Sequence, residues 1–495
     1  MYTLNYKLSK STFMKGSQCV KSLYLNKFHK DLRDPVSESK QAIFDTGHQV
    51  GDLARNLFPG GINSDFSFDL DADKAYAKTL ELIKSGQKVI YEAAFIYDEC
   101  LAVMDILFND GKVWKAYEVK SSTSAKEEYK LDASYQYYVI ENSGIHLDDV
   151  SIVYINNQYV RQGELDINEL FSIESVLDTA RSKIGLIRES IVTYKKILES
   201  GKIPEMGIGE YCSKPYDCDF LSHCWKHIPE DSIFDISGMF TKKKIELYNS
   251  GIVKISDITT DIKLSVNQKL QVDSAKNNTT VIDKRSIGDF LNNLNYPLFF
   301  LDFETIRPAV PVYNNHRPYQ QIPFQYSLHI VSKQGDNPLH FEFLATGIDD
   351  PRKALIESLI EQTKGTGDIL VYNETFERKR LEEIARDFPE YTNDIESMLM
   401  RLKDLMIPFK DKHYYKPEMR GSYSIKEVLP ALVPELKYDG LAINNGDLAS
   451  ITFMKIVNKE FSESEVEKLR KDLLEYCKLD TFAMVMILEV LYGVG

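Results

Sequence analysis

The chain has no run of about 18 apolar residues, so the sequence predicts no membrane-spanning helix. Residues 1–15 are mixed polar and lack the apolar core of a signal peptide, and we expect a cytoplasmic protein. Cysteine is scarce, with 6 among 495 residues. In a reducing compartment such thiols are metal ligands or core residues more often than disulfides. The chain also lacks low-complexity tracts and fixed-period repeats, which excludes a repeat architecture.

Basic residues are outnumbered, with 60 Lys and Arg against 74 Asp and Glu and a net charge of −14. This balance argues against a broad surface that coats nucleic acid. It leaves open an enzyme with a local basic groove and an acidic centre. The length allows roughly two to four domains, and 29 Tyr and 25 Phe are enough aromatics for stacking platforms as well as cores.

The first half of the chain contains a β block. Strand-like runs at 93–97, 101–108 and 113–119 are separated by short turns, the second being Asn-Asp-Gly, which is typical of hairpins. The remaining patterns of this half are helical at 13–28, 39–57 and 131–142, strand-like at 150–155, and helical again over 167–200. Around the β block the order is therefore helix, three strands, helix, strand.

Charged residues occur at particular places in this block. Glu92 opens the first predicted strand, Asp105 interrupts the second, and Glu118 and Lys120 end the third on one face. A carboxylate pair with a lysine suits metal-assisted phosphodiester hydrolysis, with Asp105 and Glu118 holding the ion and Lys120 orienting water and offsetting charge. A charged strand end is usually only solvated, but an acid followed after about a dozen residues by acid-x-Lys is harder to explain in that way.

These positions resemble the PD-(D/E)XK nuclease superfamily, specifically its RecB-like branch, with Asp105, Glu118 and Lys120 at the motif positions. The resemblance implies three further functional residues: His48 on the preceding helix, Glu92 as an additional metal-binding acid, and Gln136 on the following helix. The branch usually has a tyrosine four residues after the glutamine, whereas this sequence has Ile140.

Four cysteines form a separate pattern: Cys19, Cys212, Cys218 and Cys224. Zinc could use four cysteines, but structural zinc sites favour gaps of two to four residues, and an iron–sulfur cluster fits better. The pattern resembles the split cysteines of CRISPR-adaptation and AddB-type nucleases, although their C-terminal trio has a shorter first gap. That resemblance implies a 4Fe–4S clasp. We interpret Cys100 and Cys477 as packing residues.

Residues 229–290 are predicted to be a helical linker. A turn at 249–252 between two helical patterns resembles a helix–hairpin–helix, whose amides can receive a phosphate. A helical spacer with a glycine cap is the alternative.

The last 200 residues begin with an apolar strand at 299–303 that carries Asp302 and, just beyond, Glu304. Residues two apart share a strand face. Two carboxylates against an apolar wall repel each other unless a cation compensates them, which is typical of an Mg²⁺ or Mn²⁺ site. A strand edge with solvated acids is the alternative. Strands at 324–331 and 339–344, a helix at 351–363, a strand at 368–372 and a helix N-capped by Asn373 follow. A final helix over 473–491 carries Tyr476 and Asp480 on one face.

These motifs resemble the DEDD family of 3′–5′ exonucleases in its tyrosine subtype, which has an RNase H-like core. Asp302 and Glu304 match its first motif, Asn373-x-x-Phe376-Glu377 its second, and Tyr476-x-x-x-Asp480 its third. The family normally has Asp where this chain has Glu377. The resemblance implies a two-ion site held by Asp302, Glu304, Glu377 and Asp480, with Tyr476 orienting the attacking water or assisting its deprotonation. The segment 421–426 either lines the strand path or is a turn-to-helix junction.

We therefore expect an α/β protein with a PD-(D/E)XK restriction-endonuclease-like domain at 1–228, the linker at 229–290 and an RNase H-like domain at 291–495. This order resembles a bacterial family that joins the two nuclease types. The expected function is Mg²⁺- or Mn²⁺-dependent hydrolysis of DNA, entered from an end or as a single strand. A nucleic-acid-binding scaffold with silent sites and an exoribonuclease remain the alternatives.

Overall fold

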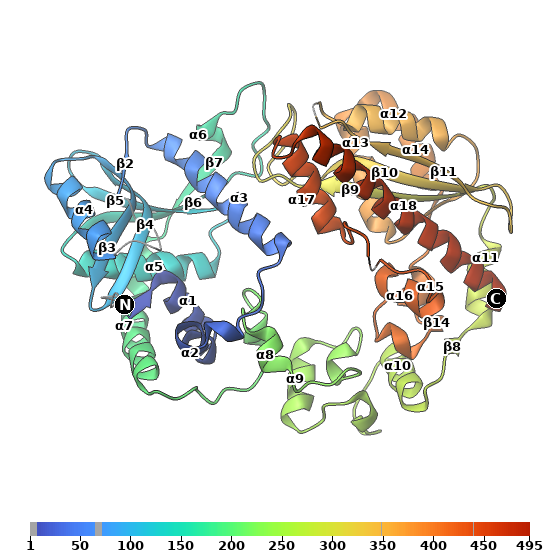
Figure 1. Ribbon diagram of the computed structural model, residues 1–495, viewed down its shortest axis with the longest axis horizontal. Helices are drawn as coiled ribbons and strands as arrows, with labels where there is room; N and C mark the ends of the chain where they lie inside the picture. Colours follow the sequence, from blue (N-terminus) through green and yellow to red (C-terminus); the bar gives the residue numbers. More distant parts are fainter. Residues whose placement is uncertain (1–6, 65–71, 348, 439) are drawn as a thin grey trace. The chain divides into compact units, whose positions relative to one another are not determined.

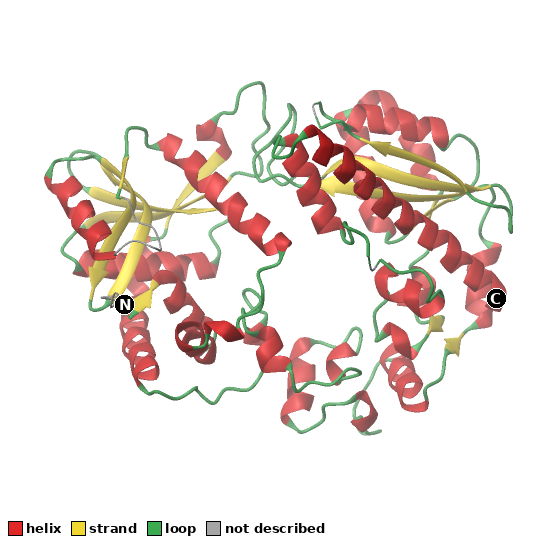
Figure 2. Ribbon diagram, in the orientation of Figure 1, coloured by secondary structure: helices red, strands yellow, loops and turns green. Residues whose placement is uncertain are grey.

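The computed structural model describes residues 7–64, 72–347, 349–438 and 440–495. The chain divides into two compact units: unit 1 is 1–227 with 309–319, and unit 2 is 228–308 with 320–495. Both units combine helices with sheets (Figure 2), so the predicted α/β class is confirmed. No helix in the described part of the chain is long and apolar enough to cross a membrane.

Unit 1 is built on a seven-stranded sheet. Its strands are β1 Leu8–Ser9, β2 Ile62–Asn63, β3 Val89–Tyr97, β4 Cys100–Asn109, β5 Trp114–Lys120, β6 Leu147–Ile155 and β7 Phe171–Ser175. They are ordered β2-β3-β4-β5-β6-β7, and β1 pairs in parallel with β4. The predicted block of three strands is confirmed as the antiparallel set β3–β5, and β6 joins β5 in parallel after a helical crossover.

Helices cover both faces of this sheet. The helices of unit 1 are α1 Lys10–Gln18, α2 Val20–Phe28, α3 Glu38–Ala54, α4 Ala72–Lys84, α5 Glu127–Asn142, α6 Ile167–Leu170, α7 Leu177–Glu199 and α8 Leu221–Trp225. Side chains alternate along the strands: Leu107 and Ala116 pack in the core with α5 and α7, while Ile106 and Tyr117 pack in the core with α3. The prediction of helix over 167–200 was wrong at β7, because 171–175 pairs with β6.

Unit 2 contains a five-stranded sheet ordered β11-β10-β9-β12-β13. Its strands are β9 Leu298–Ile306, β10 Ile322–Val331, β11 Leu339–Leu344, β12 Ile369–Val371 and β13 Leu402–Asp404, and β8 Val281–Ile282 pairs separately with β14 Tyr414–Tyr415. Strands β9–β11 are antiparallel, whereas β12 is parallel to β9 and β13 is parallel to β12. The predicted order of three strands, helix, strand, helix is confirmed.

The helices of unit 2 are α9 Thr241–Asn249, α10 Val266–Asn277, α11 Lys284–Asn292, α12 Arg352–Gln362, α13 Glu374–Asp387, α14 Thr392–Met400, α15 Ile407–Lys410, α16 Ile425–Leu432, α17 Gly446–Val457 and α18 Glu463–Val494. Phe299, Leu301 and Phe303 of β9 pack in one core with α12, α13 and α14. Helices α17 and α18 also pack against β9, and α18 runs along the sheet in Figure 1. Alternation along β9 therefore turns Asp302 and Glu304 toward α18.

The segment before β9 is helical, as predicted, but the helix–hairpin–helix resemblance does not extend to its second helix. After α9, Gly251 has φ of +87° and the chain forms only a three-residue 3₁₀ turn, Ile255–Asp257. A glycine in the left-handed region is the usual end of a helix, so this stretch has the form of the glycine-capped spacer.

Candidate metal centres

The end of β5 lies in a buried network of charged and polar side chains. Lys120 Nζ donates to Glu118 Oε1 at 2.6 Å and to Asp132 Oδ2 at 2.7 Å. Gln136 Nε2 donates to Glu118 Oε2 at 2.6 Å and to Asp132 Oδ1 at 3.2 Å. The structure thus brings together three predicted site residues, Glu118, Lys120 and Gln136. Sequence reasoning missed Asp132, although its position four residues before Gln136 places both on one helix face.

The buried Glu118 and the half-buried Asp105 share this site but have opposite pKa shifts. Burial, with the added charge of Glu118, raises the pKa of Asp105 to about 8. Burial also raises the pKa of Glu118, but the ammonium groups of Lys10 and Lys120 outweigh it and lower that pKa to about 2. Asp105 Oδ2 accepts a hydrogen bond from the Val119 N–H at 2.6 Å. Near neutral pH, Asp105 is therefore protonated and the neighbouring Glu118 is ionised. A cation bound by both carboxyl groups would displace the proton of Asp105.

Glu92 lies inside β3, so the prediction that it opens the strand was wrong. Its φ is +52°, and the antiparallel pairing steps from Tyr91–Ile106 to Ala93–Met104, leaving Glu92 and Asp105 outside the regular ladder. A non-glycine residue in the left-handed region costs about 1–3 kcal/mol, and such strain concentrates at functional sites. Burial raises the pKa of Glu92, although the guanidinium of Arg55, 2.9 Å away, opposes this.

His48 is not joined to this network. It lies exposed on α3, and in the described part of the chain its ring makes no hydrogen bond to Glu118 or Lys120. The preceding residue, Gly47, faces the Ser121 hydroxyl just beyond β5. Helix α3 therefore lies beside the site with its histidine turned to solvent.

The four cysteines predicted to act together line one pocket, although Cys19 is far from the others in sequence. Residues 13–28 do not form the single predicted helix, because Cys19 is extended (φ −160°) and separates α1 from α2. Among these described cysteines, no three sulfurs lie within 4.8 Å of one another.

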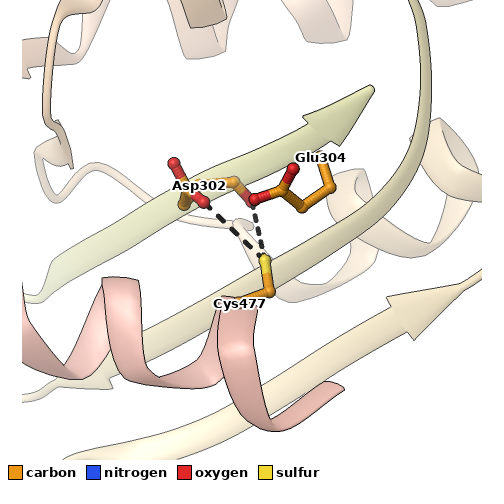
Figure 3. A group of neighbouring side chains, drawn as sticks. All are labelled: Asp302, Glu304 and Cys477. Carbon is orange, nitrogen blue, oxygen red and sulfur yellow. Dashed lines mark hydrogen bonds between the residues drawn. The ribbon is translucent and has the colours of Figure 1, made fainter. Parts of the chain in front are cut away.

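In unit 2, Asp302 and Glu304 of β9 share a face, as predicted, and meet Cys477 of α18 (Figure 3). One ligand atom from each of the three residues lies within 4.8 Å of the others. The Cys477 thiol is 3.7 Å from Asp302 Oδ2 and 4.0 Å from the Asp302 carbonyl oxygen. Cys477, which we interpreted as a packing residue, is buried, and it also contacts the candidate metal ligand Asp302. Cys100, by contrast, is buried in the core of unit 1, as predicted.

Asp480 and Tyr476 also lie on α18, and both are buried. Burial raises the pKa of Asp480 to about 6, although the Tyr438 hydroxyl, which donates to Oδ1 at 2.5 Å, opposes the rise. Lys426 Nζ lies 5.4 Å from the ring centroid of Tyr476 and 5.5 Å from that of Tyr438. Ser424 caps α16, so 421–426 is the turn-to-helix junction, and it also brings Lys426 to the site. No sequence signal identified Tyr438.

Glu377 of α13 completes the acidic group. It is 2% exposed, and its Oε2 has no hydrogen-bond partner in the part of the chain that the structure describes. Burial raises its pKa, and the negative charge of Asp302 adds to the rise. Asn373 is the N-cap residue of α13, as predicted, although its φ is +84° and its side chain makes no capping bond. Its backbone N–H instead donates to Asp404 Oδ1 at 3.1 Å.

The four acids of unit 2 therefore converge from β9, α13 and α18. Burial raises the pKa of Asp302 and of Glu304 well above the usual values, and the charge of Asp480 raises both further. Lys426 is the nearby positive charge that opposes these shifts. The raised pKa values mean that acids of this group hold protons in the ion-free protein, and a bound cation would displace those protons.

Comparison with known proteins adds a family match and three relatives. Residues 299–424 match the family model described as "Domain of unknown function (DUF2779)", a span that contains β9 and α13. "Uncharacterized protein UU173" of Ureaplasma parvum is 24% identical over 463 residues, covering 87% of this chain and 63% of the relative. "Uncharacterized protein MG366 homolog" of Mycoplasma pneumoniae is 30% identical over 208 residues, covering 38% of this chain and 31% of the relative. "Uncharacterized protein MG366" of Mycoplasma genitalium is 27% identical over 214 residues, covering 40% and 32%. The alignments with the two Mycoplasma proteins thus span about a third of those relatives.

Proposed function

We propose that the chain is a metal-dependent nuclease that hydrolyses DNA at two sites, an RNase H-like DEDD-type exonuclease centre in unit 2 and a RecB-like PD-(D/E)XK centre in unit 1. The observation that carries the proposal is the group of four acids in unit 2, three of them buried, in which Glu377 Oε2 has no hydrogen-bond partner among the described residues. Burying such oxygens without a partner is costly. Carboxylate oxygens are the ligands that Mg²⁺ and Mn²⁺ prefer, so the donor set fits these ions.

In unit 2, Asp302, Glu304, Glu377 and Asp480 would hold the ions, which supply a Lewis acid and a water of lowered pKa. Burial, reinforced by the charge of Asp480, raises the pKa of Tyr476 far above its usual value. Its hydroxyl stays protonated, so it orients the attacking water by hydrogen bonding and does not accept a proton. Tyr438 holds Asp480 through its hydrogen bond to Oδ1.

In unit 1, Asp105 and Glu118 would hold the ion and Glu92 would assist. Burial lowers the pKa of Lys120, but the charges of Asp132 and Glu118 outweigh this and raise it well above the usual value. Lys120 therefore remains a cation that offsets charge developing on the phosphate, and it does not act as a base. Gln136 fixes the orientation of Glu118.

The cysteine pocket would hold a 4Fe–4S cluster that clasps the N-terminal helices to the segment around α8. The four cysteines that line one pocket support this assignment, because four thiolates are the usual ligands of such a cluster. Iron and acid-labile sulfide measured on anaerobically purified protein test this assignment, and stoichiometric zinc without sulfide would contradict it.

The nuclease proposal is tested by Mn²⁺- and Mg²⁺-dependent digestion of end-labelled single- and double-stranded DNA, beside Asp302→Asn and Lys120→Met variants and matched RNA. Laddering from the 3′ end that is lost in Asp302→Asn and retained in Lys120→Met identifies unit 2 as the exonuclease. Loss only in Lys120→Met moves the activity to unit 1. Faster cleavage of RNA makes the protein an exoribonuclease, and binding without cleavage under any condition leaves the scaffold alternative.

A further inference from the structure

A second lysine, absent from the motifs described above, reaches the acidic network of unit 1. Lys10 Nζ donates to Glu118 Oε1 at 2.6 Å and lies 3.8 Å from Asp132 Oδ2. Lys120 Nζ donates to the same Oε1 at 2.6 Å. Two ammonium groups thus share one carboxylate oxygen, and Gln136 occupies the other oxygen.

The backbone fixes where the Lys10 side chain begins. Lys10 is the first residue of α1, directly after Ser9, whose side chain caps the helix, and β1 is paired with β4, the strand that carries Asp105. At the other end of α1, Gln18 Nε2 donates to the Tyr211 and Tyr216 carbonyl oxygens at 2.8 and 2.7 Å. Because both ends of α1 are anchored, the fold holds the Lys10 side chain within hydrogen-bonding distance of Glu118.

The two lysines are not held equally. Lys120 makes two short contacts, to Glu118 and to Asp132 at 2.7 Å, and its side chain is 19% exposed. Lys10 makes one short contact, and its side chain is 28% exposed. A flexible four-carbon stem with a route to solvent can withdraw its charge when another cation takes its place, and Lys10 has fewer short contacts to lose than Lys120.

We propose that Lys10 is an internal competitor for the divalent ion of unit 1: its ammonium holds Glu118 in the ion-free protein and leaves when Mg²⁺ or Mn²⁺ binds. The inference rests on the proposed function, in which Glu118 is an ion ligand. It makes Lys10 a positioning residue that sets the affinity for the ion. A purely structural ion pair would act in the opposite sense, since breaking it would loosen Glu118 and weaken ion binding.

The test is Mn²⁺ titration of the full-length protein by calorimetry, in an Asp302→Asn, Asp480→Asn background that removes the unit 2 site. Lys10→Met, which removes a positive charge beside the ion, is expected to lower the Mn²⁺ Kd by about tenfold or more. Lys10→Arg is expected to raise it several-fold, because a guanidinium fork binds a carboxylate more firmly. Lys7→Met is the matched control: Lys7 pairs with Glu99 and Glu199 at the surface, and the Kd should not change.

An unchanged or higher Kd in Lys10→Met, with the thermal transition of unit 1 intact, would overturn the role of Lys10 and leave the proposed site standing. Should Lys10→Met fail to fold, Lys10→Arg decides alone, since a Kd equal to or lower than that of the parent contradicts competition. If the parent protein binds no Mn²⁺ at unit 1, both the site and the inference are wrong.

Discussion

Replacing Asp480 by asparagine is expected to stabilise the ion-free protein at pH 8 by about 3 kcal/mol. Asp480 is buried, and burial raises its pKa from 3.8 to about 6. The folded state therefore favours the protonated form of Asp480. The contribution of this carboxyl to the free energy of unfolding is fully present below pH 3.8 and is lost as the pH rises through about 6. At about 1.4 kcal/mol for each pKa unit, the loss reaches about 3 kcal/mol at pH 8. Asparagine carries no charge at any pH of the assay, and its side-chain oxygen can still accept the hydrogen bond from the Tyr438 hydroxyl.

The assay is thermal unfolding of the parent and the variant in EDTA at pH 4 and pH 8. For a unit of this size the expected gain at pH 8 is roughly 6–12 °C in the unit 2 transition, with little gain at pH 4. Adding Mn²⁺ at pH 8 should raise the parent transition by ligand linkage and raise that of the variant much less. A substitution at a proposed ligand therefore increases stability while it removes ion binding.

The control is Glu475→Gln, which removes a carboxylate from the exposed side of the same helix and should leave the transition within about 0.5 kcal/mol. If Asp480→Asn is no more stable than the parent at pH 8 in EDTA, ionisation of Asp480 does not destabilise the ion-free fold. An equal gain in Tm at pH 4 and pH 8 would contradict the prediction in the same way.

Further predictions concern the packing that supports unit 2. Gly367→Ala should lower the free energy of unfolding by several kcal/mol, because a Cβ there would lie 1.8 Å from the Pro297 carbonyl oxygen; an unchanged Tm would contradict this. Gly288→Ala, on α11 with open space around it, should instead gain about 0.5–1 kcal/mol. Arg352→Met should cost about 3–5 kcal/mol in denaturant unfolding, because Arg352 is 2% exposed and pairs with Asp387; a loss below about 1 kcal/mol would mean that the buried pair contributes little.

Patterns local in sequence were predicted correctly. The alternation along β9 put Asp302 and Glu304 on one face because side chains on a strand repeat every two residues, and the turn signals separated β3, β4 and β5. The i, i+4 spacing placed Tyr476 and Asp480 together on α18. Each of these depends on neighbours within one element, which the sequence displays directly.

Contacts between distant segments were not visible in the sequence. Lys10 reaches Glu118 across 108 residues and Tyr438 reaches Asp480 across 42, and neither lies at a spacing that marks a shared face. The strand β7 was hidden in a charged, helix-like stretch because its pairing with β6 overrides local propensity. The left-handed φ of Glu92 likewise depends on the register of β3 with β4, which one strand alone does not specify.

The division of the chain has a consequence for limited proteolysis. Residues 309–319 belong to unit 1 although the strands on either side, β9 and β10, belong to unit 2. Arg161 Nη1 donates to the Pro311 and Val312 carbonyl oxygens, each at 2.9 Å, which fixes this insertion on unit 1. The backbone therefore passes between the units three times. One cut near residue 228 separates most of unit 1 from the insertion, which stays on the C-terminal fragment and is held to unit 1 by noncovalent contacts alone. A fragment that ends at that cut would lack 309–319 and expose the surface around Arg161, so unit 1 is complete only when the C-terminal half of the chain is present.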